Sequence, residues 1–262
     1  MSRPTISCIV PVFNGERYLS ETLDSIFAQT YPWLEVIVVN DGSTDGSARL
    51  LKSYKDRVIY LEQADKGPAA ARNLGVTRSR GEFVAFLDQD DLWDPEKLTR
   101  QMARFEARAE LDLCIAHVQL FWVPELRVEA IRLRDQWRAH VVPGYTTGTL
   151  LTRRTFFDAV GPFDTSLWFG DATEWFLRAI EKKAVIELLP DVLLYHRMHR
   201  ANLTRRRLSN SREEFLGIVK RSLDQRRQRS EGPVSLELPK SRVSCDGRNI
   251  EVVPVGAKKQ SP

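Results

Sequence analysis

The chain is short of cysteine, of long apolar runs and of excess charge. Its 262 residues include 3 cysteines, an odd and scattered set that excludes a disulfide framework and a paired-cysteine metal site. No apolar run approaches the roughly 18 residues that a membrane span needs. Pro11, Asn14 and Glu16 interrupt the N-terminal apolar stretch where a signal peptide would need a continuous one. These absences predict a cytoplasmic protein.

Lysine and arginine number 39 against 35 for aspartate and glutamate, which gives a formal net charge of +4. So small an excess gives no reason to predict a nucleic-acid partner. Hydrophobic residues make up 42% of the chain and charged residues 28%. That composition supports a substantial core and excludes a disordered or fibrous protein.

The first hundred residues alternate between short apolar runs and helical patterns. The predicted strands are Thr5–Val12, Leu34–Val39, Val58–Leu61 and Phe83–Leu87, and the predicted helices are Glu16–Gln29, a segment from Thr44 or Asp45, and Ala69–Val76. This alternation predicts an α/β fold with a mostly parallel central sheet flanked by helices. Ligands of such sheets bind beyond the carboxyl ends of the strands.

The rest of the chain is less regular and predicts a smaller, mixed half. We expect helices at Glu96–Ala107, Arg153–Val160, Asp171–Lys182 and Arg212–Arg227, and strands at Leu111–Val123, Tyr145–Thr152, Val185–Leu189 and Val192–Tyr195. The last helix is basic and carries an apolar stripe. The predicted organisation is one domain over 1–205, a basic helix over 206–229 and a loosely ordered tail over 230–262.

Polar clusters follow the first two strands. Phe13, at the end of the first strand, is placed to stack on a flat base, a contact worth on the order of 1–3 kcal/mol, or else to fill the core. Asp41, at the end of the second, can accept hydrogen bonds from a base or a ribose. The alternative for Asp41 is a turn that caps the next helix.

Three aspartates stand directly after the apolar run Phe83–Leu87, at Asp88, Asp90 and Asp91. Carboxylates this close repel one another unless a cation offsets their charge, and their oxygens are the ligands that Mg²⁺ and Mn²⁺ prefer. A metal held here would neutralise a diphosphate leaving group. The alternative is a solvated acidic loop. The cluster therefore predicts a Mn²⁺ or Mg²⁺ site.

Small residues surround Arg72 in the segment Lys66–Asn73. They would let a helix approach a ligand or the sheet closely. Arg72 can make a two-pronged contact with phosphate or pair with a carboxylate. An ordinary surface arginine is the alternative.

Four motifs, in order, resemble family 2 glycosyltransferases: PVFN from residue 11, VNDGSTD at 39–45, KGPAAARNLG at 66–75 and FLDQDDLW at 86–93. The resemblance spans residues 4–205 and implies the GT-A fold. Residues 4–93 would bind the nucleotide sugar and residues 94–205 the acceptor. The implied reaction is inverting, metal-dependent transfer of a sugar from a nucleotide diphosphate sugar, with a UDP-sugar as first candidate, to an acceptor hydroxyl.

The resemblance also assigns roles residue by residue. It implies nucleotide-sugar contacts for Pro11, Phe13, Asn14, Asp41, Arg72, Asp88 and His199. Asp88 and Asp90 look like a DXD-type pair that touches ribose and metal, and Asp91 is a further metal candidate. His199 belongs to an RxHxxN segment, where a histidine could complete the metal's coordination or bind the diphosphate.

Members of this family tend to carry an acidic motif, often Gly-Glu-Asp, that supplies the general base at the start of a helix. Here the matching stretch is Gly170-Asp171-Ala172, so alanine stands at the second acidic position. Asp171, by position, or Glu174 would then remove the acceptor's proton. Their spacing of three places both on one helix face, and a desolvated carboxylate near another acid has a raised pKa. The alternative is a pair that only stabilises the helix start.

Two other functions stay open at this stage. Ala172 is compatible with a sugar-nucleotide-binding protein that has lost catalysis. A nucleotidyltransferase could use a similar sheet, but it would need a Gly-rich phosphate loop where this chain has Phe13–Glu16. The acceptor, whether glycan, lipid-linked or small molecule, is not identified, although Trp168 is the best candidate to contact it. The basic helix is predicted first to be an ordinary solvated helix. The alternative is that it makes peripheral contact with the inner face of a membrane.

Overall fold

The computed structural model describes residues 4–133, 141–206 and 208–228. Its central strand, β1 (Ile6–Val12), is buried along its whole length. Parallel neighbours flank it on both sides, β2 (Leu34–Asp41) and β4 (Phe83–Phe86), and β3 (Ile59–Gln63) adds a further parallel strand beyond β2. Continuous β-branched and apolar sequence is what a strand covered on both faces requires.

The same sheet continues into a mixed half. Strand β8 (Leu151–Arg153) runs antiparallel to both β4 and β6 (Leu113–Trp122), and β9 (Ile186–Met198) runs parallel to β6. Two short strands complete it, β5 (Leu92–Trp93) against β9 and β7 (Val142–Pro143) against β6. The strand order is β3-β2-β1-β4-β8-β6-β9-β5. The predicted α/β architecture with a parallel first half is confirmed.

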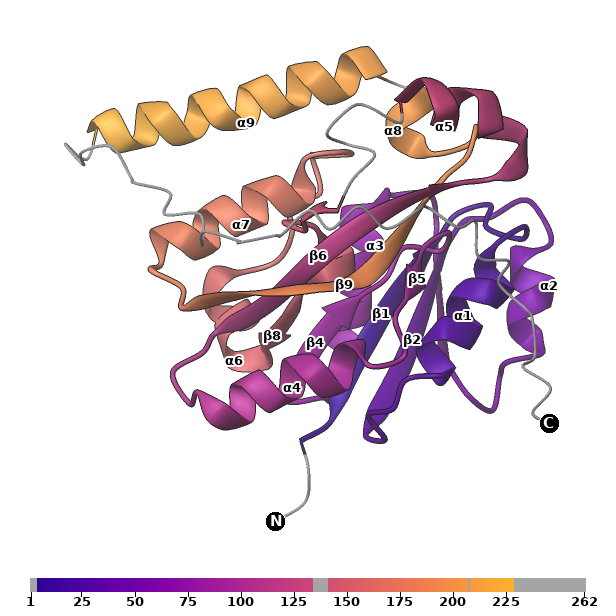
Figure 1. The fold of residues 1–262 in the computed structure, drawn as a ribbon, viewed down its shortest axis with the longest axis horizontal. Helices are drawn as coiled ribbons and strands as arrows, with labels where there is room; N and C mark the ends of the chain where they lie inside the picture. Colours follow the sequence, from indigo (N-terminus) through magenta and orange to yellow (C-terminus); the bar gives the residue numbers. More distant parts are fainter. Residues whose placement is uncertain (1–3, 134–140, 207, 229–262) are drawn as a thin grey trace.

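Helices cover both faces of the sheet (Figure 1). Helices α1 (Leu19–Phe27) and α4 (Lys97–Ala107) pack on one face, and α3 (Pro68–Arg78), α6 (Arg154–Val160) and α7 (Asp171–Glu181) pack on the other. Alternate residues of β1 feed the two cores, with Cys8 and Val10 facing α1 and Ile9 facing α3 and α7. Helix α2 (Ser47–Lys52) follows β2.

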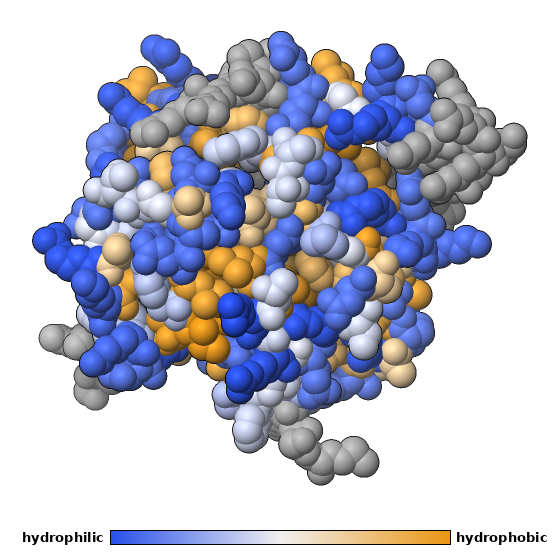
Figure 2. Space-filling model, turned by 180° about the vertical axis from the view of Figure 1, so that it is seen from behind, coloured by the Kyte–Doolittle hydropathy of each residue, from blue (hydrophilic) through white to orange (hydrophobic). Residues whose placement is uncertain are grey.

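The remaining helices lie together at one end of the molecule. A 3-10 turn at Pro124–Leu126 leads into α5 (Arg127–Leu133), and α8 (Leu203–Arg206) leads towards α9 (Leu208–Gln228), which lies alongside α7 (Figure 1). From behind, hydrophilic surface surrounds a group of apolar side chains near the middle of the face (Figure 2). In the described ranges, no helix has both the length and the apolar character to cross a membrane.

Several predictions for the second half are wrong in detail. Over Tyr145–Thr152 the chain forms a 3-10 turn at Thr147–Thr149 before the short β8, because Gly148 lets the chain approach Leu194 closely. A Cβ on Gly148 would lie 2.7 Å from Leu194 Cδ2. The two strands expected between 185 and 195 are one strand, β9, which continues through an irregularity in its register with β6. The predicted tail over 230–262 lies outside the described residues.

Candidate active site

The carboxyl ends of β1, β2 and β4 open onto a cavity of about 960 Å³. This volume is near the upper end of the range for ligand sites, about 300–1,000 Å³. Both halves of the chain line the cavity. The predicted site residues found in its wall are Pro11, Phe13, Asn14, Asp41, Arg72, Asp88, Asp90, Asp171 and His199. Asp91 and Glu174 are not among the lining residues.

Phe13 lines the cavity with 44% of its surface exposed, so it does not fill the core. Its backbone is held by Gln89, whose Oε1 accepts from Phe13 N at 2.8 Å and whose Nε2 donates to Phe13 O at 2.8 Å. One side chain thus pairs with both backbone groups, as a neighbouring strand would. This clamp holds the backbone of Phe13 beside the aspartate loop, and no sequence motif points to it.

Asp41 and Asn14 hold the loops of the cavity rim. Asp41 Oδ1 accepts from Lys66 N at 2.9 Å, and its Oδ2 accepts from Gly67 N at 2.8 Å. Gly67 has φ +87°, a backbone conformation that favours glycine. Asn14, at φ +53°, accepts from Thr44 N through its Oδ1 at 2.8 Å. Both predicted ligand contacts therefore already serve the backbone that surrounds the cavity.

Arg72 joins the two halves of the site. Its Nη2 donates to Asp88 Oδ1 at 2.5 Å and its Nη1 donates to Asp171 Oδ2 at 2.6 Å. Burial alone would lower the pKa of Arg72, but the two carboxylates raise it above its ordinary value, so the guanidinium stays charged. Arg72 was predicted to contact phosphate, to pair with a carboxylate or to lie on the surface, and the structure shows the carboxylate pairing. Its buried Nε has no hydrogen-bond partner.

Asp171 begins helix α7 and is 5% exposed. Burial raises the pKa of its carboxyl, Arg72 opposes the rise, and the charge of Asp88 adds to it. The net shift is upward, which makes the carboxylate a better proton acceptor than an ordinary aspartate. Glu174 is placed differently from what the helix spacing predicts: its carboxylate pairs with Arg178, at 2.7 Å from Nε to Oε1, and does not line the cavity.

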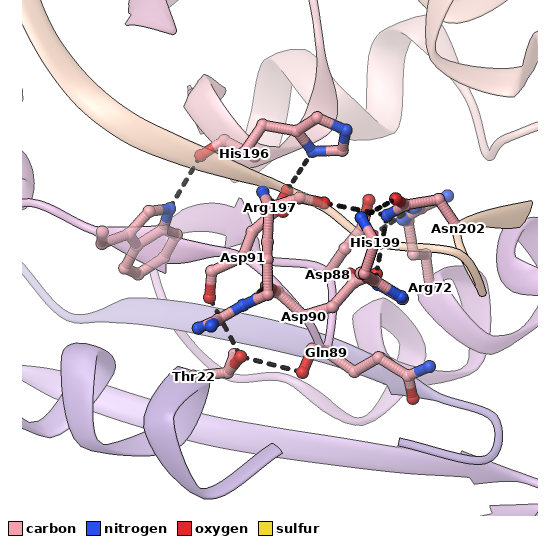
Figure 3. A network of polar contacts seen from close by, with 12 residues as sticks. Thr22, Arg72, Asp88, Gln89, Asp90, Asp91, His196, Arg197, His199 and Asn202 are labelled. Atoms are coloured by element: carbon pink, nitrogen blue, oxygen red, sulfur yellow. Dashed lines mark hydrogen bonds and ion pairs between the residues drawn. The ribbon is translucent and has the colours of Figure 1, made fainter. Parts of the chain in front are cut away.

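The loop of three aspartates is fixed by α1 (Figure 3). The hydroxyl of Thr22, which is fully buried, lies 2.8 Å from Gln89 O and 2.9 Å from Asp91 O, so its one hydrogen is shared between two carbonyls. Carbonyls bonded in this way cannot rotate freely. Thr22 therefore holds the backbone of the aspartate loop in place.

Asp90 meets the RxHxxN segment at the cavity wall (Figure 3). His199 Nδ1 accepts from Ala201 N at 3.2 Å, so the ring proton resides on Nε2, which donates to Asp90 Oδ2 at 2.8 Å. Asn202 folds back on the same turn, where its Oδ1 accepts from His199 N at 2.6 Å. Its Nδ2 donates to Arg197 O at 2.9 Å. Asn202 thus sets the position of His199, and the RxHxxN motif alone did not predict this role.

Asp91 points away from the cavity and is 3% exposed. Its Oδ2 pairs with His196 Nδ1 at 2.9 Å and its Oδ1 accepts from Arg197 N at 3.0 Å. Burial lowers the pKa of His196, but the charge of Asp91 outweighs this and raises it to about 9. The predicted metal role does not fit this geometry, because both carboxylate oxygens already attach β9 to the aspartate loop.

A divalent cation fits the remaining donors only as part of a complex with phosphate. In the described ranges, no three His, Cys, Asp or Glu side chains gather closely enough to hold a metal ion. Asp90 offers a carboxylate, whereas both ring nitrogens of His199 are already hydrogen-bonded, Nε2 to Asp90 Oδ2 and Nδ1 to the amide of Ala201. Mg²⁺ is commonly held by one or two carboxylates, with substrate phosphates and water completing its coordination. The donor set is of that kind.

Solved structures with the same fold confirm its class. S. aureus TarS 1–349 in complex with UDP matches with a TM-score of 0.64 at 22% identity, covering 84% of this chain and 65% of that one. Mannosyltransferase PcManGT from Pyrobaculum calidifontis, in complex with GDP-Man and Mn²⁺, matches with a TM-score of 0.64 at 22% identity, covering 85% and 65%. The predicted GT-A fold is therefore confirmed.

Sequence comparison gives the family. The model for glycosyl transferase family 2 matches residues 7–161. An uncharacterised glycosyltransferase of Rickettsia typhi is 31% identical over 223 residues, which cover 81% of this chain and 69% of the relative. Glycosyltransferase GlyA of Streptococcus pneumoniae is 39% identical over 119 residues, 44% of this chain and 17% of GlyA. The chain belongs to the family 2 glycosyltransferases.

Proposed function

We propose that this protein transfers a sugar from a UDP-sugar to an acceptor hydroxyl with inversion, and that Asp171 is its general base. The observation that carries the proposal is the Asp88–Arg72–Asp171 bridge in the cavity wall. It attaches an ionisable carboxylate of the second half to the aspartate loop of the first. A donor bound along that loop would place its sugar beside Asp171.

The proposed chemistry is a direct displacement. The acceptor oxygen forms a bond to the anomeric carbon while the bond from that carbon to the diphosphate breaks on the opposite face. Asp171 takes the acceptor's proton, and UDP leaves with the bonding electron pair. Its upward-shifted pKa supports this role, because general-base catalysis is most effective when the base has a pKa nearer the working pH.

The donor would bind across the first half. Phe13 offers an exposed ring for the base, and Asp41 and Asp88 line the part of the cavity where the ribose would lie. Asp90 is the residue that would hold a divalent cation, which when bound would supply positive charge opposite the departing diphosphate, and His199 would orient its carboxylate. The complexes of TarS with UDP and of PcManGT with GDP-Man and Mn²⁺ support a nucleotide-sugar donor and a metal.

A thermal-shift screen tests donor binding. UDP-GlcNAc, UDP-glucose and GDP-mannose are added singly, with and without Mn²⁺, because a ligand of the folded state raises its melting temperature. One donor should give a rise that Mn²⁺ increases. Failure of every nucleotide sugar and of UDP itself to shift the melting temperature would contradict the proposal. The anomeric configuration of the product, measured by NMR, then decides between inversion and retention.

A binding protein without catalysis is the second candidate, because Ala172 lines the cavity where the family tends to place an acid. It predicts nucleotide binding without release of UDP from any donor, and no change in Asp171→Asn. The acceptor and the predicted membrane contact stay predictions. Ile218, from the stripe assigned to that contact, is only 2% exposed, whereas Phe215 is 49% exposed.

A further inference from the structure

A carboxylate from α9 occupies the start of helix α7. Glu214 Oε2 accepts from Trp168 N at 3.1 Å, and its Oε1 accepts from Phe169 N at 2.8 Å and from Gly170 N at 2.6 Å. Helix α7 starts at the next residue. Its N-cap is Gly170, which has no side chain to cap the helix. A negative charge at a helix N-terminus is favoured by the helix dipole. Here that charge comes from 43 positions further along the chain than Asp171, on another helix.

The contact between α9 and this loop is also tightly packed. Ile218, one turn beyond Glu214, is 2% exposed and lies over Gly170. A Cβ on Gly170 would lie 2.2 Å from Ile218 Cδ1 and 3.3 Å from Glu214 Oε1. Gly170 has φ −104°, which any residue can adopt, so it is the closeness of α9 that favours glycine here.

The loop under α9, residues 168–170, forms part of the cavity wall. Trp168 and Phe169 line the cavity, and the Trp168 indole lies against Gly67, with 3.6 Å from its Cε2 to a Cβ built on that glycine. Asp41 holds the amide of Gly67 at the end of β2. Asp171 follows the loop directly. Any displacement of residues 168–170 would therefore move both this wall and the carboxylate of Asp171.

We propose that Glu214 is a positioning residue for transfer: it holds residues 168–170 in place and thereby aims Asp171 and closes the cavity with Trp168. Helix α9 is then part of the active site. The effect on catalysis rests on the proposed role of Asp171. The effect on the loop does not, so the two can be tested separately.

The loop is tested by hydrogen–deuterium exchange of the full chain, read by mass spectrometry of peptides spanning 165–175. Glu214→Ala should speed exchange of the three amides, because they lose their acceptor. Glu213→Ala is the matched control, since it removes the same charge from the neighbouring, exposed position of the same helix. Equal exchange in Glu214→Ala and the unsubstituted chain would overturn the proposal. This measurement needs no active enzyme.

Catalysis is tested with the donor found in the thermal-shift screen, by the rate of nucleotide release. A misplacement of about 1 Å at the reacting groups can cost about 10²-fold in rate. We expect kcat to fall by up to about that factor in Glu214→Ala, with the Kd for UDP changed less than about threefold and Glu213→Ala unchanged. Glu214→Gln should recover part of the rate, because its amide oxygen still accepts a hydrogen bond. A kcat equal to that of Glu213→Ala would overturn the catalytic claim.

A second route covers the case in which Glu214→Ala fails to fold. Gly170→Ala pushes α9 away from the loop while Glu214 stays in place. Its kcat should also fall, and Ile218→Ala in the same chain should restore part of it by removing the clash. If Gly170→Ala left both exchange and kcat unchanged, α9 would not control the loop. A chain that exchanges as predicted but releases no nucleotide from any donor would count against the proposed function alone.

Discussion

The two parts of the cavity wall are built in different ways. Before residue 93, side chains mostly bond to the backbone of neighbouring loops, as Asp41 does to Gly67 and Gln89 to Phe13. After residue 93, two side chains of the cavity wall bond to distant side chains of the first part, Asp171 to Arg72 and His199 to Asp90. The loops of the first part are held mainly by contacts within that part, and we call them the frame. The second part depends on contacts with the first and with α9.

Replacing Asp171 with asparagine should give the largest effect, because it removes the base and leaves the frame intact. General-base catalysis typically contributes about 10²–10⁴-fold, so kcat should fall by that factor. The Kd for UDP, measured by calorimetry, should change little. Unaltered turnover in Asp171→Asn would show that Asp171 is not the base.

Asp90→Ala tests the contact that joins the aspartate loop to His199. Removing one group that stabilises transition-state charge costs about 2.7–4 kcal/mol, or roughly 10²–10³ in kcat. We expect turnover to fall by that factor and its dependence on Mn²⁺ to weaken. Asp191→Ala is a control for a carboxylate of the surface, where Asp191 pairs with Arg100. Full metal-stimulated activity in Asp90→Ala would contradict the assignment.

The pH dependence of kcat/KM should show how the ion pair between Arg72 and Asp171 shifts the pKa of Asp171. Asp171 accepts a proton only when ionised, so log kcat/KM should rise with pH at unit slope until the carboxyl is ionised. Since the pKa of Asp171 is raised by burial and held down by Arg72, removing the arginine charge in Arg72→Gln should move this limb to higher pH. A limb that stayed in place or moved to lower pH would separate Asp171 from the base role.

Thr22→Val should affect the frame rather than the chemistry. It leaves the carbonyls of Gln89 and Asp91 without their shared donor while keeping the side chain's shape. Buried groups deprived of a partner cost about 1–3 kcal/mol, which should appear in the free energy of unfolding measured in urea. Thr77→Val, at an exposed helix position, is the matched control. Equal stability of the two variants would mean that the loop needs no such support.

Glu174→Gln should give the smallest effect. Its ion pair with Arg178 is of the i,i+4 kind and lies outside the cavity lining. The loss of stability should be below about 1 kcal/mol, and kcat should stay within about twofold. A fall in kcat comparable to that of Asp171→Asn would reverse the choice between the two acids.

Much of the first part could be predicted from sequence because its contacts are local or follow from strand ends. Buried apolar runs place Phe13, Asp41 and Asp88 after parallel strands, whose carboxyl ends share one edge. In the second part, fewer site residues follow a buried strand, so their positions could not be predicted from strand ends. Helical spacing placed Asp171 and Glu174 on one face, but the i,i+4 spacing of Glu174 and Arg178, which favours an ion pair, was the stronger signal for Glu174.

Two further misses come from long-range contacts. Asp91 belongs to the acidic cluster in sequence, yet its partners His196 and Arg197 come more than a hundred residues later. Glu214 carries no motif, and its contacts depend on how α9 lies over α7. Local pattern identifies which residue types stand at a strand's end, whereas side-chain direction is decided by long-range packing.

Strand β8 restricts how the two halves of the sheet can move relative to each other. It is hydrogen-bonded to β4 on one side and to β6 on the other, through Val84 opposite Thr152 and Cys114 opposite Leu151. A hinge motion that parted the halves would have to break this ladder. A clamshell opening of the two halves would therefore cost these backbone hydrogen bonds, whereas the rim segment 168–170 lies outside the ladder and is held by Glu214 of α9.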